Sequence, residues 1–193
     1  MNKQAVIDFF DRCAPHWDAN MVRNDSVIEA IFNAAGIHEG IEVLDVACGT
    51  GVLFPYYLKK NISALTGIDI SPKMVEVAKQ NFPDVNVICG DVEELNVNKG
   101  FDAIMVYNAF PHFPDPKKLI NCLSKMLNKN GTLTVAHGMS RMALHRHHSG
   151  AASSISIELL HENDLADIFT DCGLEIRTKI SDEEKYIVSG ILL

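Results

Sequence analysis

Glu42-Val43-Leu44-Asp45-Val46-Ala47-Cys48-Gly49-Thr50-Gly51 is the stretch that decides the fold of this chain. It reads as a short apolar strand that runs into a glycine turn, and residues 52–60 behind the turn have the pattern of a helix. Glycine lets a backbone approach a ligand that a Cβ atom would exclude, and the following helix offers N–H groups to an anionic group. A dinucleotide-binding fingerprint needs a third glycine where Phe54 stands, so we do not expect a cradle for the phosphates of NAD.

Strand-like and helix-like stretches alternate beyond this turn. The pattern predicts strands at 41–46, 64–69, 85–89, 101–107 and 131–137, and helices at about 52–60, 72–82 and 116–128. This alternation is typical of βαβ units, which build an α/β fold with a parallel sheet and right-handed crossovers. The strands are continuous apolar runs, as expected when helices cover both faces of the sheet.

The composition is that of an ordinary globular domain. The 193 residues are 47% apolar and 22% charged. They contain no apolar run of about 18 residues and no secretory leader, so we expect no membrane insertion. The net charge of −8 argues against a nucleic-acid partner. The five cysteines form no C-x-x-C pair, which favours free thiols and a cytoplasmic location.

Polar residues stand at the ends of three further predicted strands. Asp69 ends the second strand, Asp91 follows the third and Asn108 ends the fourth. In an open α/β sheet these ends meet at the crevice where ligands bind. A carboxylate at Asp69 can accept hydrogen bonds from two ribose hydroxyls. Asp91 and the N–H of Val92 suit an adenine ring, and the carbonyl of Asn108 suits an ammonium group. The alternatives are a helix cap at Asp69 and a turn at Asn108.

Together, residues 45–51 and these strand ends resemble the class I S-adenosylmethionine-dependent methyltransferases, over nearly the whole chain. The resemblance implies a Rossmann-like sheet of seven strands in the order 3-2-1-4-5-7-6, whose last strand is antiparallel. It also implies methyl transfer from S-adenosylmethionine to a small-molecule acceptor by in-line displacement at the sulfonium methyl. The cofactor-binding residues that it implies are Trp17, Asp45, Ala47, Cys48, Gly49, Gly51, Asp69, Ile70, Asp91, Val92 and Asn108.

A single domain is expected over residues 1–193. Its four parts are an N-terminal helical cap, a cofactor-binding core, a variable histidine-rich lid and a C-terminal helix with two strands, at 1–40, 41–137, 138–160 and 161–193. In the methyltransferases that this chain resembles, the segment around Trp17 caps the cofactor and substrate pocket. The alternative is that Trp17 packs a helix on the core.

Histidines mark the predicted acceptor side. His112 lies in a proline-rich loop, where it either reaches the pocket or packs the loop. His137 ends the fifth strand, so we expect it to face the pocket. His145 and His148 would share one helical face. A substrate-contacting lid, a metal site and a surface turn are the alternatives for the segment that holds them.

The candidates for catalysis and acceptor binding are His112, His137, Arg141, His145 and His148, and no metal ligand is assigned. Arg141 could form a fork for a carboxylate or phosphate on the acceptor. A loop rich in His and Arg predicts a polar or anionic acceptor, or an imidazole that takes its proton. The alternative to an enzyme is a sensor with the same fold, which would bind S-adenosylmethionine or a metal without turnover.

Overall fold

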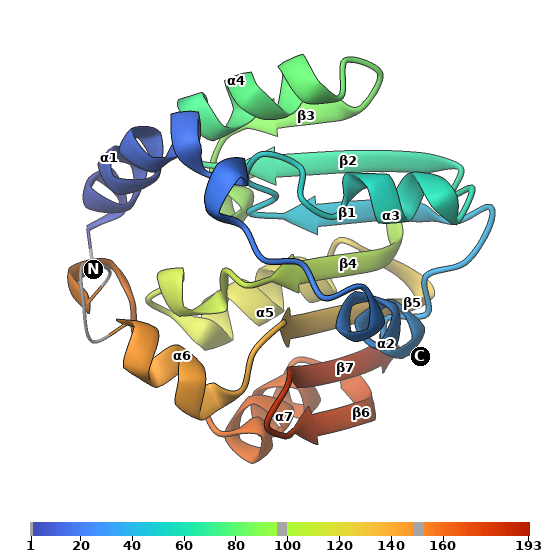
Figure 1. Cartoon of the computed structure of the whole chain (residues 1–193). Helices are drawn as coiled ribbons and strands as arrows, with labels where there is room; N and C mark the ends of the chain where they lie inside the picture. The colour runs from blue at the N-terminus through green and yellow to red at the C-terminus, as the bar shows by residue number, and fades with distance from the viewer. Residues whose placement is uncertain (1, 96–99, 149–152) are drawn as a thin grey trace.

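A sheet of seven strands, in the order β3-β2-β1-β4-β5-β7-β6, forms the centre of the part of the chain that the structure describes (Figure 1). This computed structural model describes residues 2–95, 100–148 and 153–193. The strands are β1 (Glu42–Val46), β2 (Ala64–Asp69), β3 (Asn86–Cys89), β4 (Phe101–Tyr107), β5 (Leu127–His137), β6 (Leu174–Ser181) and β7 (Tyr186–Leu192). The predicted strand order is confirmed.

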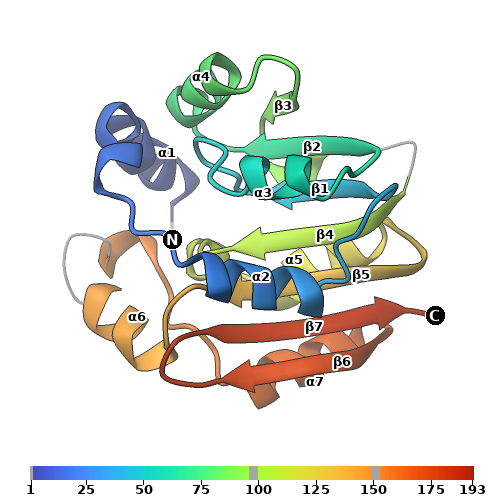
Figure 2. The same cartoon turned by 45° about the vertical axis from the view of Figure 1, so that its right-hand side comes forward.

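The first five strands run parallel, and the direction changes only at the end of the chain. β1 pairs in parallel with β2 and β4, and β4 with β5, whereas β7 pairs antiparallel with both β5 and β6. Figure 2 shows β7 pointing opposite to β4. The predicted antiparallel last strand is therefore present, and the parallel strands all deliver their carboxyl ends to one edge.

Helices cover both faces of the sheet. They are α1 (Lys3–Cys13), α2 (Asp25–Ala34), α3 (Phe54–Lys59), α4 (Pro72–Asn81), α5 (Pro116–Ser124), α6 (Arg141–His148) and α7 (Glu162–Asp171). One apolar core lies under α2, α3 and α4, and the other lies under α5 and α7. Local chemistry fixes where helices begin: the side chain of Ser71 accepts a hydrogen bond from Met74 N at 3.1 Å, one residue before Pro72 starts α4.

The helix predicted at 116–128 is shorter than expected. α5 ends at Ser124, and Leu127 already pairs with Phe101 as the first residue of β5. Asn130 has a φ of 64°, which a continuing helix could not accommodate. Burial of Leu127 against the core therefore overrides the helical pattern of the sequence.

Two segments lie beyond the carboxyl ends of the parallel strands. In both views α1 and α6 stand at this edge, away from the faces that α2, α3, α5 and α7 cover (Figures 1 and 2). α1 packs against α4 and is followed by two short 3-10 turns, Ala14–His16 and Asp18–Asn20. Within the described residues, no helix has the length and apolar character that a membrane crossing requires.

Candidate active site

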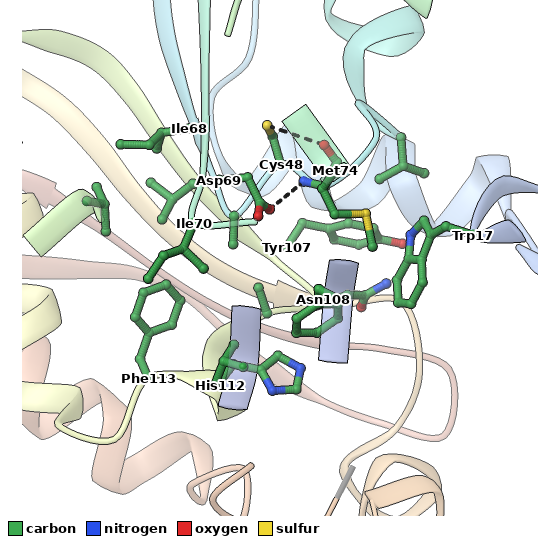
Figure 3. A pocket seen from close by; sticks show the side chains of 18 of the residues that line it. Trp17, Cys48, Ile68, Asp69, Ile70, Met74, Tyr107, Asn108, His112 and Phe113 are labelled. Carbon is green, nitrogen blue, oxygen red and sulfur yellow. Dashed lines mark hydrogen bonds between the residues drawn. The ribbon is translucent and has the colours of Figure 1, made fainter. Parts of the chain in front are cut away.

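A cavity of about 620 Å³ opens where β1, β2, β3 and β4 end, beneath α1. Of the residues that the sequence predicted to bind the cofactor, nine line it: Trp17, Ala47, Cys48, Gly49, Asp69, Ile70, Asp91, Val92 and Asn108. His112 lines it as well. Figure 3 shows Asp69 and Cys48 on one side of this space, with His112 and Phe113 across from them.

The glycine turn bends its backbone toward the cavity. Ala47 and Gly49 both adopt left-handed conformations, with φ of 53° and 55°. A Cβ atom added to Gly49 would meet no protein atom within 4 Å. Because Gly49 lines the cavity, this open side is where a ligand can approach the backbone closely.

Gly51, which the sequence predicted to bind the cofactor, packs against buried aromatic rings. It does not line the cavity, and its φ is 88°. A Cβ atom there would lie 2.7 Å from the ring of Phe54, and one on Gly67 would lie 2.7 Å from the same ring. Phe54 is fully buried, so its ring fills the space between the turn and β2. This packing explains why a phenylalanine stands where a dinucleotide fingerprint has its third glycine.

Asp69 holds the turn in place. Gly49 N donates to its Oδ2 at 2.8 Å (Figure 3), and Ser71 N donates to its Oδ1 at 2.8 Å. The side chain lines the cavity although the residue is only 8% exposed. Burial raises the pKa of this carboxyl to about 6, against the two backbone bonds, which lower it.

The raised pKa of Asp69 predicts an unusual pH dependence of stability. The pKa of this carboxyl is about 6 in the folded chain and 3.8 as its ordinary value, so between these pH values the folded state holds a proton that the unfolded state has lost. The contribution of Asp69 to the free energy of unfolding is therefore expected to fall as pH rises from about 4 to about 6, by on the order of 3 kcal/mol. Urea unfolding of the wild type and of Asp69→Asn across this range measures the difference. Parallel pH curves for the two proteins would contradict the assignment.

Asp91 binds the N-terminal cap. Its Oδ1 accepts from Glu93 N at 2.9 Å, and its Oδ2 forms an ion pair with Lys3 Nζ. Lys3 also pairs with Glu93 at 2.9 Å, and these two carboxylates raise the pKa of the lysine. The residue predicted to bind adenine is thus in contact with α1.

Two further carboxylates tie the cap to the loops around the cavity. Asp11 accepts from Ser71 Oγ at 2.6 Å, and Asp18 accepts from Thr50 Oγ1 at 2.6 Å. Ser71 caps α4 two residues after Asp69, and Thr50 belongs to the glycine turn. The cap therefore contacts the turns that follow β1, β2 and β3, and it places Trp17 in the cavity wall.

The loop after β4 forms the opposite wall. Asn108 has a φ of 54°, and its Oδ1 accepts from Gly138 N at 2.9 Å, which joins the ends of β4 and β5. His112 Nδ1 lies 2.9 Å from the carbonyl of Ile155, and the His112 ring meets the ring of Phe10 edge to face, with centroids 4.9 Å apart. His112 therefore connects the cap, this loop and the segment behind α6.

Asp45 and His137 lie outside the cavity wall, contrary to prediction. Asp45 is 2% exposed beneath the turn, where burial and then Asp69 raise its pKa. His137 is fully buried, and its ring lies edge to face with that of Tyr186 at 6.1 Å. Side chains alternate along β5, so His137 shares the side of Val135, which belongs to the core under α5 and α7.

Arg141, which was predicted to bind the acceptor, does not line the cavity either. Its Nε donates to the carbonyl of Leu159 at 3.0 Å, and its Nη2 lies 3.4 Å from Glu158, so it fastens α6 to the following segment. His145 and His148 lie in α6, but their side chains are outside the described part of the chain, and their roles stay predictions. Across residues 2–95, 100–148 and 153–193, no group of three or more His, Cys, Asp or Glu is placed to hold a metal ion.

Sequence reasoning missed most of the apolar wall. Phe9, Phe10, Met139 and Leu144 line the cavity, as does Tyr107 at the end of β4. Phe9 and Phe10 belong to the predicted N-terminal helical cap, and these two adjacent aromatic residues were a signal in the sequence. Met139 and Leu144 sit among histidines and arginines, and that polar context hid them.

Comparisons with known proteins agree with this geometry. A family model described as "Methyltransferase domain" matches residues 44–135, from β1 into β5. The malonyl-(acyl-carrier protein) O-methyltransferase of Priestia megaterium is 32% identical over 139 residues, which are 69% of this chain and 51% of that protein. The ubiquinone biosynthesis O-methyltransferase of Coxiella burnetii is 34% identical over 100 residues, which are 49% of this chain and 42% of that protein.

The chain spans about half the length of the curated relatives that it matches first. Among solved structures, magnesium protoporphyrin IX methyltransferase from Synechocystis PCC 6803 with bound SAH covers 100% of both chains, with a TM-score of 0.75 and 19% identity. That likeness shows the same fold.

Proposed function

Because the chain belongs to the class I S-adenosylmethionine-dependent methyltransferases, we propose that it transfers a methyl group from S-adenosylmethionine to a small-molecule acceptor. The observation that carries the proposal is the open side of Gly49 next to the carboxylate of Asp69 in one cavity. A backbone that a ligand can approach, beside an acceptor for hydroxyl groups, suits an adenosyl group attached to an amino acid.

The residues of the cavity fit this cofactor. Asp69 would accept from the ribose hydroxyls, Asp91 and the N–H of Val92 would bind adenine, and Gly49 with Asn108 would hold the amino-acid end. When bound, S-adenosylmethionine supplies an activated methyl group on a sulfonium. Carboxylates that line the cavity suit a ligand with positive charge at its sulfur and amine.

The chain itself contributes binding, orientation and exclusion of water. The cap contributes Trp17 and Phe10 to the cavity wall, and apolar side chains in that wall would keep water from the reacting groups. The two walls hold donor and acceptor side by side, which accounts for a large share of the rate increase in such reactions. His112 is the candidate base, because it is the titratable ring that lines the cavity on the side of the loop after β4, where the Ile155 carbonyl holds its Nδ1 at 2.9 Å.

The five free cysteines among the described residues support a reducing compartment such as the cytoplasm. The acceptor is proposed to be a small molecule because the cavity, at about 620 Å³, must also hold the cofactor.

Ligand preference is the first test of this function. Calorimetry is expected to give tighter binding of S-adenosylmethionine and S-adenosylhomocysteine than of NAD, by roughly 100-fold or more, because Phe54 fills the place of a phosphate-binding turn. Tighter binding of NAD would overturn the proposal. An acceptor screen that follows S-adenosylhomocysteine separates an enzyme from a sensor, since only an enzyme accumulates this product.

A further inference from the structure

Large apolar side chains contribute a substantial part of the cavity wall. Three of them come from the cap, one from the loop after β4 and two from the segment around the start of α6: Phe9, Phe10, Trp17, Phe113, Met139 and Leu144. Apart from the indole N–H, these side chains offer no strong hydrogen-bonding group. A polar acceptor would lose its water here without gaining partners, at a cost of about 1–3 kcal/mol for each unsatisfied group.

The charges in the wall disfavour an anionic acceptor. Among the described residues, three carboxylates line the cavity, those of Asp69, Asp91 and Glu93, against the cations of Lys3 and Arg23. Lys3 is already paired with two of the carboxylates, and Arg23 is exposed to solvent. The histidines and arginines of residues 137–148 led us to expect a polar or anionic acceptor, but among the side chains of this segment that the structure describes, those of residues 137–144, Met139 and Leu144 reach the wall.

Aromatic rings meet edge to face around Phe10. Its ring centroid lies 5.3 Å from that of Phe9, 5.7 Å from that of Trp17 and 4.9 Å from that of His112, with interplanar angles of 84°, 74° and 82°. We call these four residues the aromatic cluster. Rings fixed in this way offer faces and edges to a further ring. An aromatic ligand should therefore bind here more favourably than an alkyl chain of similar area, by about 0.5–1.5 kcal/mol.

A titratable group adjoins this apolar wall. His112 belongs to the aromatic cluster, and its Nδ1 lies 2.9 Å from the Ile155 carbonyl and 3.3 Å from Ser156 Oγ. The segment that follows α6 in the chain therefore holds the ring in place. A neutral imidazole at this place can take a proton from a weakly acidic group. A phenol combines such a group with an apolar ring.

We infer that the acceptor is an uncharged phenol, bound with its ring against the aromatic cluster and its hydroxyl toward His112. The inference rests on the proposed methyl transfer. In the reaction the phenol O–H bond breaks and its proton goes to His112. An oxygen electron pair forms the new bond to the methyl carbon, while the electrons of the broken sulfur–carbon bond stay on the sulfur of the donor. The products are an aryl methyl ether and S-adenosylhomocysteine.

Trp17 allows binding to be measured apart from turnover, because it is the single tryptophan of the chain and lines the cavity. Titration of its fluorescence with 4-ethylphenol, 4-hydroxybenzoate and 1-hexanol, in the presence of S-adenosylhomocysteine, compares a neutral phenol, an anionic phenol and an alkyl alcohol. We expect 4-ethylphenol to bind at least roughly tenfold more tightly than the other two. With S-adenosylmethionine, mass spectrometry should detect its methyl ether.

Two methionines provide a matched pair of variants. Met139 lines the cavity, whereas Met142, three residues further on, is 70% exposed. Met139→Gln should weaken 4-ethylphenol binding by roughly tenfold, and Met142→Gln should leave it unchanged. His112→Gln separates positioning from proton transfer: we expect methylation to fall by on the order of 100-fold or more, with fluorescence titrations that change little.

The outcomes distinguish this inference from the function on which it rests. Tighter binding of 4-hydroxybenzoate or 1-hexanol, or no binding of 4-ethylphenol by a protein that binds S-adenosylhomocysteine in calorimetry, overturns the phenol and leaves methyl transfer standing. Equal losses of binding and methylation in His112→Gln overturn the role of His112 as base. A protein that binds neither S-adenosylmethionine nor S-adenosylhomocysteine overturns the proposed function itself.

Discussion

Asp69→Ala is expected to lose both cofactor affinity and stability. The carboxylate accepts from Gly49 N and Ser71 N, each at 2.8 Å, and both N–H groups would lose their acceptor. Relief of a buried charge offsets part of this loss, so we expect a net destabilisation of about 2 kcal/mol. These two bonds make Asp69 part of the fold as well as of the candidate site.

Affinity for S-adenosylhomocysteine should fall by roughly 10–100-fold in the same variant, because the ribose hydroxyls lose a charged acceptor. Calorimetry gives the affinity and thermal unfolding gives the stability. Asp69→Asn is the matched control, since it keeps the volume and one acceptor oxygen, and its losses should be intermediate. A destabilised Asp69→Ala protein with the affinity of the wild type would restrict Asp69 to a structural role.

Gly49→Ala should mainly weaken cofactor binding, whereas Gly51→Ala should mainly lower stability, although the two glycines stand only two residues apart. At Gly51 the new methyl group would press on the rings of Phe54 and Phe82, at 2.7 Å and 3.0 Å, and we expect a loss of about 3 kcal/mol in stability. At Gly49 the methyl group meets no protein atom within 4 Å, so the cost is the left-handed backbone alone, about 1 kcal/mol.

Cofactor binding should show the reverse order. The methyl group of Gly49→Ala would stand where a ligand approaches the turn, and we expect affinity for S-adenosylhomocysteine to fall by roughly 100-fold. The folded fraction of Gly51→Ala should bind nearly as the wild type does. Phe54→Leu combined with Gly51→Ala tests the cause, since a smaller side chain should recover part of the lost stability. Equal effects of the two substitutions on affinity would contradict the division between packing and binding.

The sheet could be predicted from the sequence because each parallel strand is a recognisable apolar run. Apolar runs that end in Asp69 or Tyr107 need both faces covered, and a sheet between helix layers provides this. The end of α5 was harder to predict, since the pairing of Leu127 with Phe101 depends on a strand more than twenty residues away in the chain.

In the candidate site, too, one part could be predicted from the sequence and another could not. The cofactor side follows from short-range chemistry, since a turn or cap residue directly after a strand must lie at the sheet edge. The acceptor side depends on contacts between distant segments: Arg141 meets Glu158, and the cap brings Phe10 to His112. A pattern of histidines does not reveal such partners, and this is why His137 and Arg141 were assigned to the wrong surroundings.

The contacts of Lys3, Asp11 and Asp18 with the loops beneath the cap should affect how fast ligands enter and leave the cavity. The cap lines the cavity that would hold a ligand, and each of these contacts involves a charged group that dissolved ions can screen. Residence time should therefore shorten as ionic strength rises, even where the equilibrium affinity changes little. Where product release limits the proposed methyl transfer, movement of the cap would set its rate, and salt would change that rate.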